Sequence, residues 1–403
     1  MKIIVTALFG LESLVCEDLM NIGYSKDHIT ISDGMIALDV PAGQLADAVA
    51  RVNLWVRTGE RVFVELGNFQ ANTFDELFDG ISSVSWEDFI PLDFAFHING
   101  YSRKSDLFGI SACQSICKKA IVRRLLTARK KLLTDALIED ERMGLLKIQF
   151  GIVANQVSVM MDTSGEGLHK RGYRPLTHQA PIKETLAAGL VRLSRYKPFG
   201  EEALVDPFCG SGTIVIEAAL TAFSIAPGLN RPFSAEYWPI IGKDAFTKAR
   251  EEALSLQDRD VPDDIYFFGS DLDKISIESS MRNARAAGID KVVRFMKADA
   301  FTQSAEALRT WTGLPRQLIL CNPPYGERLL TEEDAQKIYE GIGRTYLDDE
   351  GYCRKGIRLS VISPDDTFER AVGRPADKRR KLYNGNIKCQ MYHYYKLGKN
   401  EKC

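Results

Sequence analysis

The stretch from residue 203 onward alternates short apolar strands with helical segments, and this alternation constrains the fold more than any other feature. Strands that alternate with helices along a chain usually form a parallel sheet with helices on both faces. We therefore expect a doubly wound α/β fold in this stretch. The expected strands are residues 203–206, 265–270, 292–296, 316–321 and 357–362.

Two further expected strands, 379–383 and 387–395, are connected differently from the first five. Asn384-Gly385 lies between them, and this dipeptide is typical of hairpin turns. An antiparallel hairpin is therefore expected at one edge, which makes a mixed seven-stranded sheet. Residues 224–262 are rich in Pro, Trp and charge, and the sequence assigns no role to this insert.

The first 165 residues read as two small α+β units, because short strands and helices follow one another there. A chain of 403 residues is long enough for two or three domains in total. The first unit is expected to contain a strand at 2–7, a hairpin around Asp33-Gly34 and a helix at 44–56. The second is expected to contain a long amphipathic helix at 111–133 and strands at 61–66, 93–100, 145–150 and 156–161.

Composition narrows the classes of function without naming one. The formal net charge is -2, so overall charge does not point to nucleic acid. Eight cysteines are scattered without the paired spacing of a zinc site, and we expect a reduced, cytoplasmic protein that holds no metal. No uncharged apolar run approaches the roughly 18 residues that a membrane-spanning helix needs, so no membrane insertion is expected.

A glycine turn follows the first alternating strand and opens the next helix. Glycines let the backbone approach a ligand closely, and the free N–H groups at a helix start can bind an anion. The turn matches neither the G-x-G-x-x-G fingerprint nor the Walker pattern of phosphate-binding loops. Its candidate cofactor-binding residues are Asp206, Pro207, Phe208, Gly210, Ser211, Gly212 and Thr213.

Acidic residues also end the strands of this sheet: Asp206 after the first, Asp271 and Asp273 after the second, and Asp299 after the third. Doubly wound sheets bind ligands at this carboxyl edge. Carboxylates there suit a ribose diol, an amino group and an adenine amine, which S-adenosylmethionine combines. Each Asp could instead cap a helix or begin a turn. Because the acids coincide with the glycine turn, we favour the cofactor-binding interpretation.

The fourth strand ends in Asn322-Pro323-Pro324-Tyr325, the most informative motif in the chain. An exocyclic amine of a nucleobase is a poor nucleophile, because its lone pair is delocalised into the ring. The Asn322 side-chain oxygen and the Pro323 carbonyl can accept its two N–H bonds and direct the lone pair at a methyl donor. Tyr325 can stack on the base. Methyl transfer then needs positioning and no base catalyst, and we count Asn322 among the cofactor contacts as well.

Two other interpretations of these motifs compete. A proline-rich turn without a function is the first, and the position of the motif at the end of the fourth strand argues against it. A cysteine nucleophile is the second, because Cys209 and Cys321 lie within the two motifs. We reject it, because cysteine is mostly a small buried hydrophobic residue and no histidine lies near either one in sequence.

With both motifs placed, the chain resembles the class I amino-methyltransferases, and in particular the bacterial THUMP-domain RNA methyltransferases of the YpsC and RlmL type. The resemblance covers essentially the whole chain. Residues 268–273 stand where the family has its ribose-binding acid, and 297–299 where it has its adenine-contacting acid. Gly326-Glu327-Arg328-Leu329 extends the catalytic motif as in this family, and residues 168–174 resemble a family signature between the RNA-binding and catalytic parts.

The resemblance implies a domain organisation and a function. Residues 1–60 would form a ferredoxin-like domain, 61–165 a THUMP RNA-binding domain, and 166–403 a Rossmann-like class I methyltransferase domain that uses S-adenosylmethionine. The expected target is guanine N2 in 23S ribosomal RNA, with transfer RNA as the alternative substrate. A single catalytic domain is expected, without the second methyltransferase domain of RlmL-type fusions.

Nine basic residues and one acidic residue lie between 103 and 131, a local positive stripe in a near-neutral chain. A solvated helix face is the simpler explanation, but the resemblance to THUMP proteins favours RNA phosphates. A second basic cluster, at 169–174, could contact phosphates or the acidic surface of the catalytic domain. The run 378–381 has least weight, because edge hairpins often carry Lys and Arg to prevent aggregation. The candidate RNA-binding residues are Arg103, Lys104, Lys118, Lys119, Arg123, Arg124, Lys130, Lys170, Arg171 and Arg174.

Two rival functions remain. Adenine-N6 methyltransferases that act on DNA or RNA share the Asn-Pro-Pro-Tyr motif, so the motif does not separate the two activities. The other rival is a non-catalytic RNA-binding ribosome-assembly factor with a vestigial pocket. The sequence specifies neither the target nucleotide nor the oligomeric state.

Overall fold

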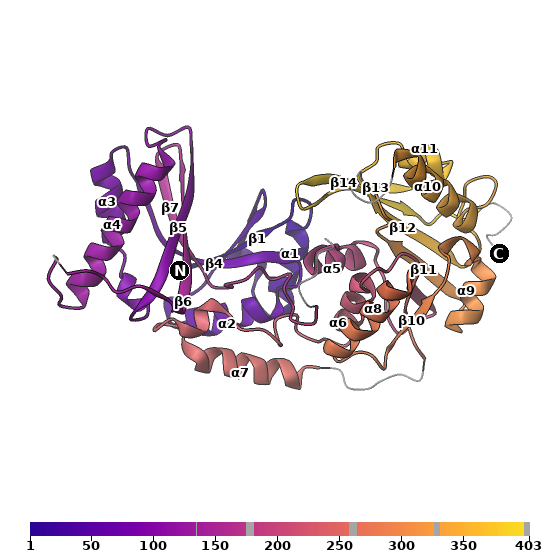
Figure 1. Ribbon diagram of the computed structural model, residues 1–403, viewed down its shortest axis with the longest axis horizontal. Helices are drawn as coiled ribbons and strands as arrows, with labels where there is room; N and C mark the ends of the chain where they lie inside the picture. The colour runs from indigo at the N-terminus through magenta and orange to yellow at the C-terminus, as the bar shows by residue number, and fades with distance from the viewer. Residues whose placement is uncertain (134, 175–180, 258–263, 326–330, 399–403) are drawn as a thin grey trace. The chain divides into compact units, whose positions relative to one another are not determined.

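The computed structural model describes residues 1–133, 135–174, 181–257, 264–325 and 331–398 (Figure 1). The backbone contacts divide the chain into two units. Unit 1 contains residues 1–7, 15–168 and 231–252, and unit 2 contains residues 8–14, 169–230 and 253–403. Two short segments, 8–14 and 231–252, therefore belong to a different unit from the residues on either side of them in sequence.

Unit 1 contains one seven-stranded sheet with the strand order β2-β3-β1-β4-β7-β6-β5. Its central strand β4 pairs with β1 on one side and with β7 on the other. The two expected α+β segments thus share a continuous sheet. The strands are β1 (Lys2–Ala7), β2 (Ile29–Ser32), β3 (Met35–Asp39), β4 (Gly59–Gln70), β5 (Phe94–Arg103), β6 (Asp140–Val153) and β7 (Gln156–Asp162).

The helices of this part of the chain begin and end at recognisable caps. The Thr73 hydroxyl accepts the N–H of Glu76, whose carboxylate accepts the N–H of Thr73, so a capping box starts α3. The helix predicted at 111–133 ends earlier, at Ala128, because Lys130 is left-handed (φ 56°) and the N–H of Lys131 returns to the Leu126 carbonyl. The helices are α1 (Glu12–Asn21), α2 (Leu45–Trp55), α3 (Phe74–Ser82), α4 (Ile110–Ala128) and α7 (Gly242–Ser255).

Residues 231–252, the central part of the insert to which the sequence assigned no role, pack within unit 1. The buried guanidinium of Arg231 donates to the backbone carbonyls of Ser164, Glu166 and Gly167 at 3.0, 2.9 and 2.6 Å. The ring of Trp238, also buried, meets the ring of Phe89 edge-on at 6.1 Å. Residues 231–252 are therefore a structural part of unit 1.

Replacing Arg231 with Ala should lower the free energy of unfolding of unit 1 by about 2 kcal/mol. Hydrogen bonds from a charged donor contribute about 1.5 to 3 kcal/mol, and the substitution leaves buried carbonyls without their donor. Denaturant unfolding measures the change, and Arg250→Ala, which removes a less buried guanidinium from the same insert, is the comparison. Equal midpoints for the Arg231 variant and the wild type would contradict the anchoring role.

Unit 2 contains a second seven-stranded sheet, ordered β10-β9-β8-β11-β12-β14-β13. The first five strands are parallel, and β14 runs antiparallel to both β12 and β13. The predicted mixed sheet with an edge hairpin is confirmed. The strands are β8 (Glu202–Asp206), β9 (Phe267–Asp271), β10 (Val293–Lys297), β11 (Arg316–Cys321), β12 (Ile357–Ser363), β13 (Lys378–Asn384) and β14 (Ile387–Tyr394). The helices are α5 (Glu184–Leu193), α6 (Thr213–Ala222), α8 (Lys274–Ala286), α9 (Ala305–Thr312), α10 (Glu332–Tyr346) and α11 (Phe368–Val372).

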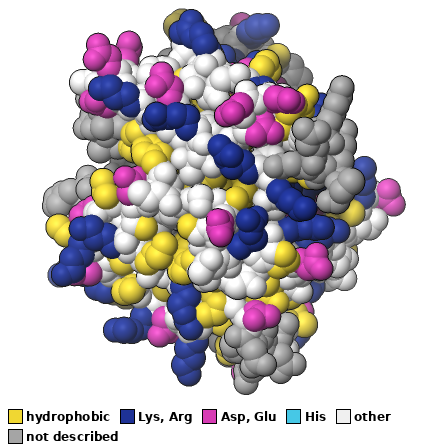
Figure 2. Space-filling model, turned by 90° about the vertical axis from the view of Figure 1, so that its right-hand side faces the viewer, with side chains coloured by type: hydrophobic (Ala, Val, Ile, Leu, Met, Phe, Trp, Pro, Cys, Tyr) yellow, Lys and Arg dark blue, Asp and Glu magenta, His cyan; other side chains and the backbone are white. Residues whose placement is uncertain are grey.

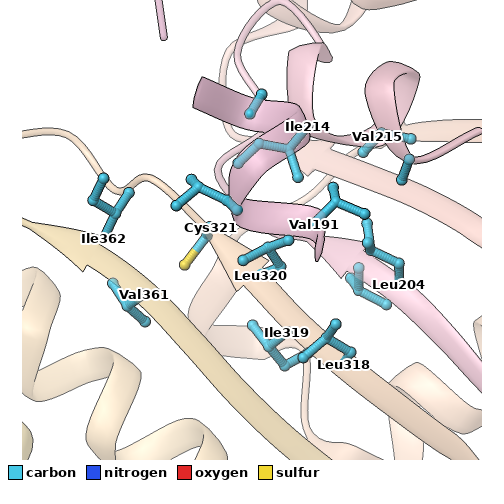
Figure 3. Packing of buried hydrophobic residues seen from close by; sticks show 14 of the residues in the cluster. Val191, Leu204, Ile214, Val215, Leu318, Ile319, Leu320, Cys321, Val361 and Ile362 are labelled. Carbon is cyan, nitrogen blue, oxygen red and sulfur yellow. The ribbon is translucent and has the colours of Figure 1, made fainter. Parts of the chain in front are cut away.

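The central strands of unit 2 are buried on both faces. Figure 3 shows Leu318, Ile319 and Leu320 of β11 beside Leu204 of β8 and Val361 of β12. All of these side chains are fully buried. Helices on both faces explain why these strands are continuous apolar runs and why they were recognisable in the sequence.

The C-terminal hairpin turns one residue later than predicted. Asn384 still pairs with Ile387, so the two turn residues are Gly385 and Asn386. Gly385 has a φ of 62°, which glycine adopts without strain. The edge strand β13 is covered in turn by the segment 8–14, since the Gly10 carbonyl accepts both Arg380 Nε and Nη2.

Because a histidine on β14 is buried, we expect the folded protein to lose stability in mild acid. Burial lowers the pKa of His393 from 6.5 to about 4, and its Nδ1 lies 2.9 Å from the Ser360 hydroxyl. The unfolded chain therefore binds a proton at higher pH than the folded chain does. The free energy of unfolding should fall as the pH drops from 6.5 towards 4. Urea unfolding at several pH values measures how steeply the free energy of unfolding falls with pH. The fall should be shallower for His393→Asn. An equally steep fall in this variant would show that His393 does not cause the loss of stability.

Candidate active site

The two motifs singled out in the sequence leave the same edge of the unit 2 sheet. Strands β8 and β11 are parallel neighbours, with Val205 opposite Ile319. The glycine turn follows β8, and the Asn-Pro-Pro-Tyr corner follows β11. Neighbouring strands lie roughly 4.8 Å apart. The two loops therefore begin side by side at the carboxyl edge of the sheet.

The backbone of the glycine turn requires glycine at two positions. Gly210 and Gly212 have φ values of 51° and 80°. Gly212 precedes α6 directly, and a Cβ on it would lie 3.0 Å from the Phe295 ring and 3.0 Å from the Ser280 Cβ. A side chain at Gly212 would therefore be strained and crowded at once.

Side chains from β9 and α8 hold the turn in place. The N–H of Gly210 donates to Asp271 Oδ2 at 2.9 Å, and its carbonyl accepts the Ser280 hydroxyl at 2.7 Å. The Ser211 carbonyl accepts Asn283 Nδ2 at 2.9 Å. Sequence reasoning found Asp271 but missed Ser280 and Asn283, since polar residues one helical turn apart carry no distinctive signal.

Asp206 lies in a different environment from Asp273 and Asp299. Asp206 is buried, burial raises its pKa well above the ordinary value, and its Oδ1 accepts the Phe208 N–H at 3.1 Å. Asp273 and Asp299 are exposed, and each caps the helical turn that follows it. The capping alternative thus describes part of their role. A carboxylate has about four acceptor positions, so a cap leaves room for a ligand hydrogen bond.

Two members of the second basic cluster, Arg171 and Arg174, face the protein interior, which corrects their assignment to RNA. Arg171 is 4% exposed and lies 3.5 Å from Glu217, which also accepts the Tyr173 hydroxyl at 3.1 Å. Arg174 donates to the Thr213 hydroxyl at 3.0 Å and pairs with Glu184. Burial leaves Arg171 no surface for a phosphate, and Arg174 supports the start of α6.

The first basic cluster divides into paired and exposed residues. Lys118 pairs with Glu139 at 2.6 Å, and Arg124 pairs with Glu87. The exposed members are Arg103, Lys104, Lys119, Arg123 and Lys130. Lys170 is half-buried.

Figure 2 looks onto a different surface, the side of unit 2 that carries α9. Basic and acidic side chains are interspersed there.

The Asn-Pro-Pro-Tyr corner contains a buried acceptor that no described residue satisfies. Among the described residues, none donates a hydrogen bond to Asn322 Oδ1. Buried polar atoms almost always have a partner, so this oxygen suits a donor on a ligand. The Tyr325 hydroxyl accepts Asn384 Nδ2 at 2.7 Å, a link to the C-terminal hairpin that the sequence did not reveal. Gly326-Glu327-Arg328-Leu329 lies outside the described residues.

The two cysteines in the motifs are unsuited to nucleophilic attack. Cys209 and Cys321 are buried, and burial raises the pKa of both thiols well above the ordinary value. The thiolate is the reactive form, so both residues stay neutral and unreactive. Across the described ranges, no helix is long and apolar enough to span a membrane, and no three His, Cys or acidic side chains gather as a metal site.

A glycine turn and an Asn-Pro-Pro-Tyr corner side by side on a sheet of this order define a class I methyltransferase. Three family models match the chain: an RMKL-like methyltransferase domain at residues 171–393, an RlmL ferredoxin-like domain at 2–63 and a THUMP domain at 71–135. The chain belongs to the RMKL-like methyltransferase family. Its methyl donor is S-adenosylmethionine.

Curated relatives and solved structures agree with this membership. The chain is 38% identical to the putative RNA methyltransferase YpsC of Bacillus subtilis, over 98% of this chain and 95% of that protein. It is 33% identical to the ribosomal RNA large subunit methyltransferase K/L of Psychromonas ingrahamii, over 85% of this chain and 44% of that protein. The chain spans about half the length of the K/L relatives, 44% to 53%.

Two solved structures share the fold over almost the whole chain. One is a putative methyltransferase in complex with SAH, which is 34% identical with a TM-score of 0.84 and 98% coverage of both chains. The other, from Listeria monocytogenes, is described as a predicted N6-adenine-specific DNA methylase, and is 36% identical with a TM-score of 0.85 over 98% of this chain and 96% of that one.

Proposed function

We propose that this protein transfers a methyl group from S-adenosylmethionine to an exocyclic amine of a base in RNA, with guanine N2 in 23S ribosomal RNA as the target. The observation that carries this proposal is the buried Oδ1 of Asn322 at the carboxyl edge of the sheet, to which no residue in the described part of the chain donates. An amine N–H of the base satisfies this acceptor.

The corner positions the acceptor nitrogen. Asn322 Oδ1 and the Pro323 carbonyl accept the two N–H bonds of the amine and hold its lone pair toward the donor methyl carbon. The donor supplies an electrophilic methyl group on a sulfonium. As the nitrogen–carbon bond forms, the carbon–sulfur bond breaks, so the nitrogen gains positive charge and the sulfur becomes a neutral thioether. Both acceptors therefore bind the transition state more strongly than the free amine. Tyr325 stacks on the base, and the surplus proton leaves to water.

The glycine turn and the acid row hold the methyl donor in this proposal. Asp271 and Asp273 bind the ribose diol and Asp299 binds the adenine amine, while the backbone N–H groups of Ser211 and Thr213 face the carboxylate of the donor. The hydrogen bonds from Ser280 and Asn283 to the carbonyls of the turn support this assignment, because they fix the direction of its backbone.

RNA is bound through the N-terminal part in this proposal. We assign residues 1–60, 61–165 and 166–403 to the ferredoxin-like, THUMP and methyltransferase domains. The exposed basic residues Arg103, Lys104, Lys119, Arg123 and Lys130 contact phosphates, with Lys170 as a further contact. A ribosomal RNA substrate implies a cytoplasmic enzyme. The name of the K/L relatives supports ribosomal over transfer RNA.

A labelled methyl donor decides between the proposal and its rivals. The enzyme is incubated with 23S ribosomal RNA from a deletion strain, with transfer RNA and with duplex DNA, and the modified nucleoside is identified by mass spectrometry. N2-methylguanosine in the ribosomal RNA is expected. Label in DNA alone would establish the adenine-N6 activity, which the description of the Listeria structure favours. If the Asn322→Ala variant fully restores the cellular function of the deletion strain, the protein is a non-catalytic ribosome-assembly factor.

A further inference from the structure

The tip of the β13–β14 hairpin projects past the carboxyl edge of the unit 2 sheet. Ser363, the last residue of β12, pairs with Gln390. The hairpin continues beyond this level through the pairs Leu382–Cys389, Tyr383–Lys388 and Asn384–Ile387. In the strand order, β9 and β10, which lead to the acids assigned to S-adenosylmethionine, lie on one side of β11, and β14 lies on the other. The overhang is therefore on the side of β11 that faces away from the proposed S-adenosylmethionine contacts.

The overhang is joined directly to the catalytic corner. Asn384 Nδ2 donates to the Tyr325 hydroxyl at 2.7 Å. Tyr325 is the ring that we assign to stacking on the target base, so the hairpin tip lies beside the proposed position of that base. A nucleotide next to the target base therefore meets the tip first.

Aromatic rings and free cations share this tip. Phe9 is 52% exposed and lies 5.9 Å from the Tyr383 ring at an interplanar angle of 59°. Lys381 Nζ lies 5.4 Å from the centre of the same ring, and Lys388 is opposite Tyr383 in the hairpin. Among the described residues, neither lysine forms an ion pair with a carboxylate.

Protection of a sheet edge does not explain these charges. The segment 8–14 already covers β13, and a Cβ on Gly10 would come within 2.6 Å of the Lys381 carbonyl. Arg380 is used to bind the Gly10 carbonyl, and Arg379 pairs with Glu369. Residues 378–391 contain five basic residues and no acidic residue. Lys381 and Lys388 thus have no carboxylate partner among the described residues, and they lie at the half-buried ring of Tyr383, which contacts the exposed ring of Phe9.

We propose that Phe9 and Tyr383, with Lys381 and Lys388, bind the single-stranded RNA that flanks the target nucleotide. This inference rests on the proposed function, since it assigns the tip to the substrate of that site. A base that reacts on its exocyclic amine must leave its stack, which exposes the faces of its neighbours. Aromatic rings stack on such bases and lysines neutralise the adjoining phosphates.

Paired substitutions test the surface with two readouts. Phe9→Leu combined with Tyr383→Leu removes the rings, and Lys381→Gln combined with Lys388→Gln removes the charges. Kinetics use 23S ribosomal RNA from a deletion strain, and affinity is measured with a fluorescent single-stranded RNA of about 12 nucleotides, within the usual site size of such surfaces, in the presence of SAH. The matched controls are Phe199→Leu and Lys355→Gln, which precede β8 and β12 and so lie at the opposite edge of the sheet.

The ring variant should raise the KM for RNA and the Kd for the oligonucleotide roughly tenfold, because base stacking contributes about 1 to 3 kcal/mol per base. The lysine variant should reduce the salt slope of binding by roughly 0.7 for each phosphate that is no longer neutralised. The KM for S-adenosylmethionine and the kcat at saturating RNA should stay at wild-type values, as should both controls.

Unchanged RNA affinity in both paired variants overturns the inference. A ring variant that loses thermal stability and donor affinity together, with no selective effect on RNA, also overturns it, because the ring pair would then be packing. Failure of the proposed function is recognised separately: the wild-type enzyme would methylate no RNA, whereas oligonucleotide binding would still report on the tip. Equal loss of affinity for duplex DNA and single-stranded RNA would contradict the choice of a single-stranded partner.

Discussion

Asn322→Ala is expected to lower kcat by about 100- to 1000-fold, the usual cost of removing one preorganised group that stabilises charge in a transition state. In the proposed mechanism the amine nitrogen becomes positive as it accepts the methyl group, and Asn322 Oδ1 accepts a hydrogen bond from its N–H. The Kd for SAH should change little, because the glycine turn does not depend on this side chain. Single-turnover kinetics and calorimetric titration with SAH measure the two quantities.

Asn322→Asp is the matched control, since it keeps an acceptor oxygen at the same position. It should retain more activity than the Ala variant. A large loss of SAH affinity in Asn322→Ala would show that the residue acts mainly on the donor. Wild-type kcat in the Ala variant would contradict the amine-orienting role.

Glu217→Ala is expected to have the largest effect on stability, about 3 to 5 kcal/mol, because removing one partner of a buried ion pair leaves the other charge uncompensated. Glu217 on α6 is fully buried and pairs with Arg171, whose side chain is 2% exposed. The Tyr173 hydroxyl would lose its acceptor as well. Denaturant unfolding and the apparent melting temperature should both report this loss.

Glu217→Gln keeps the size of the side chain and an acceptor for Tyr173, and should fall between the wild type and the Ala variant. A double variant in which Arg171 is also replaced with Met should recover part of the lost stability, since neither charge of this pair then remains buried. If Glu217→Ala unfolds at the wild-type denaturant concentration, the pair does not support the fold.

The sequence was informative where one physical requirement decides the residue type. The strands around Leu318–Leu320 were found because both faces of the sheet are covered, which demands an apolar run. The glycine turn was found because a left-handed backbone with close neighbours leaves few alternatives to glycine. The strand predicted at 61–66 extends over Gly59–Gln70 instead, since β4 pairs along both of its edges with strands distant in sequence.

The supporting contacts of the site were beyond sequence reasoning because they join residues far apart in the chain. Ser280 reaches the Gly210 carbonyl across 70 residues, Asn283 reaches Ser211 across 72, and Asn384 reaches Tyr325 across 59. For Arg171 the same separation in sequence led to a wrong prediction. A basic residue in a basic run suggests an exposed surface, but Arg171 is buried beside Glu217, which lies 46 positions away.

Residues 8–14 and 231–252 belong to a different unit from their neighbours in sequence, so a single cut in the chain does not separate the two units. A cut near residue 165 would yield an N-terminal product without residues 231–252 and a C-terminal product without residues 8–14. The first would lack the Arg231 guanidinium that caps its carbonyls, and the second would carry Trp238 with no Phe89 to receive it. Neither half is a self-sufficient module, so shuffling or expressing them separately requires both segments to be grafted back.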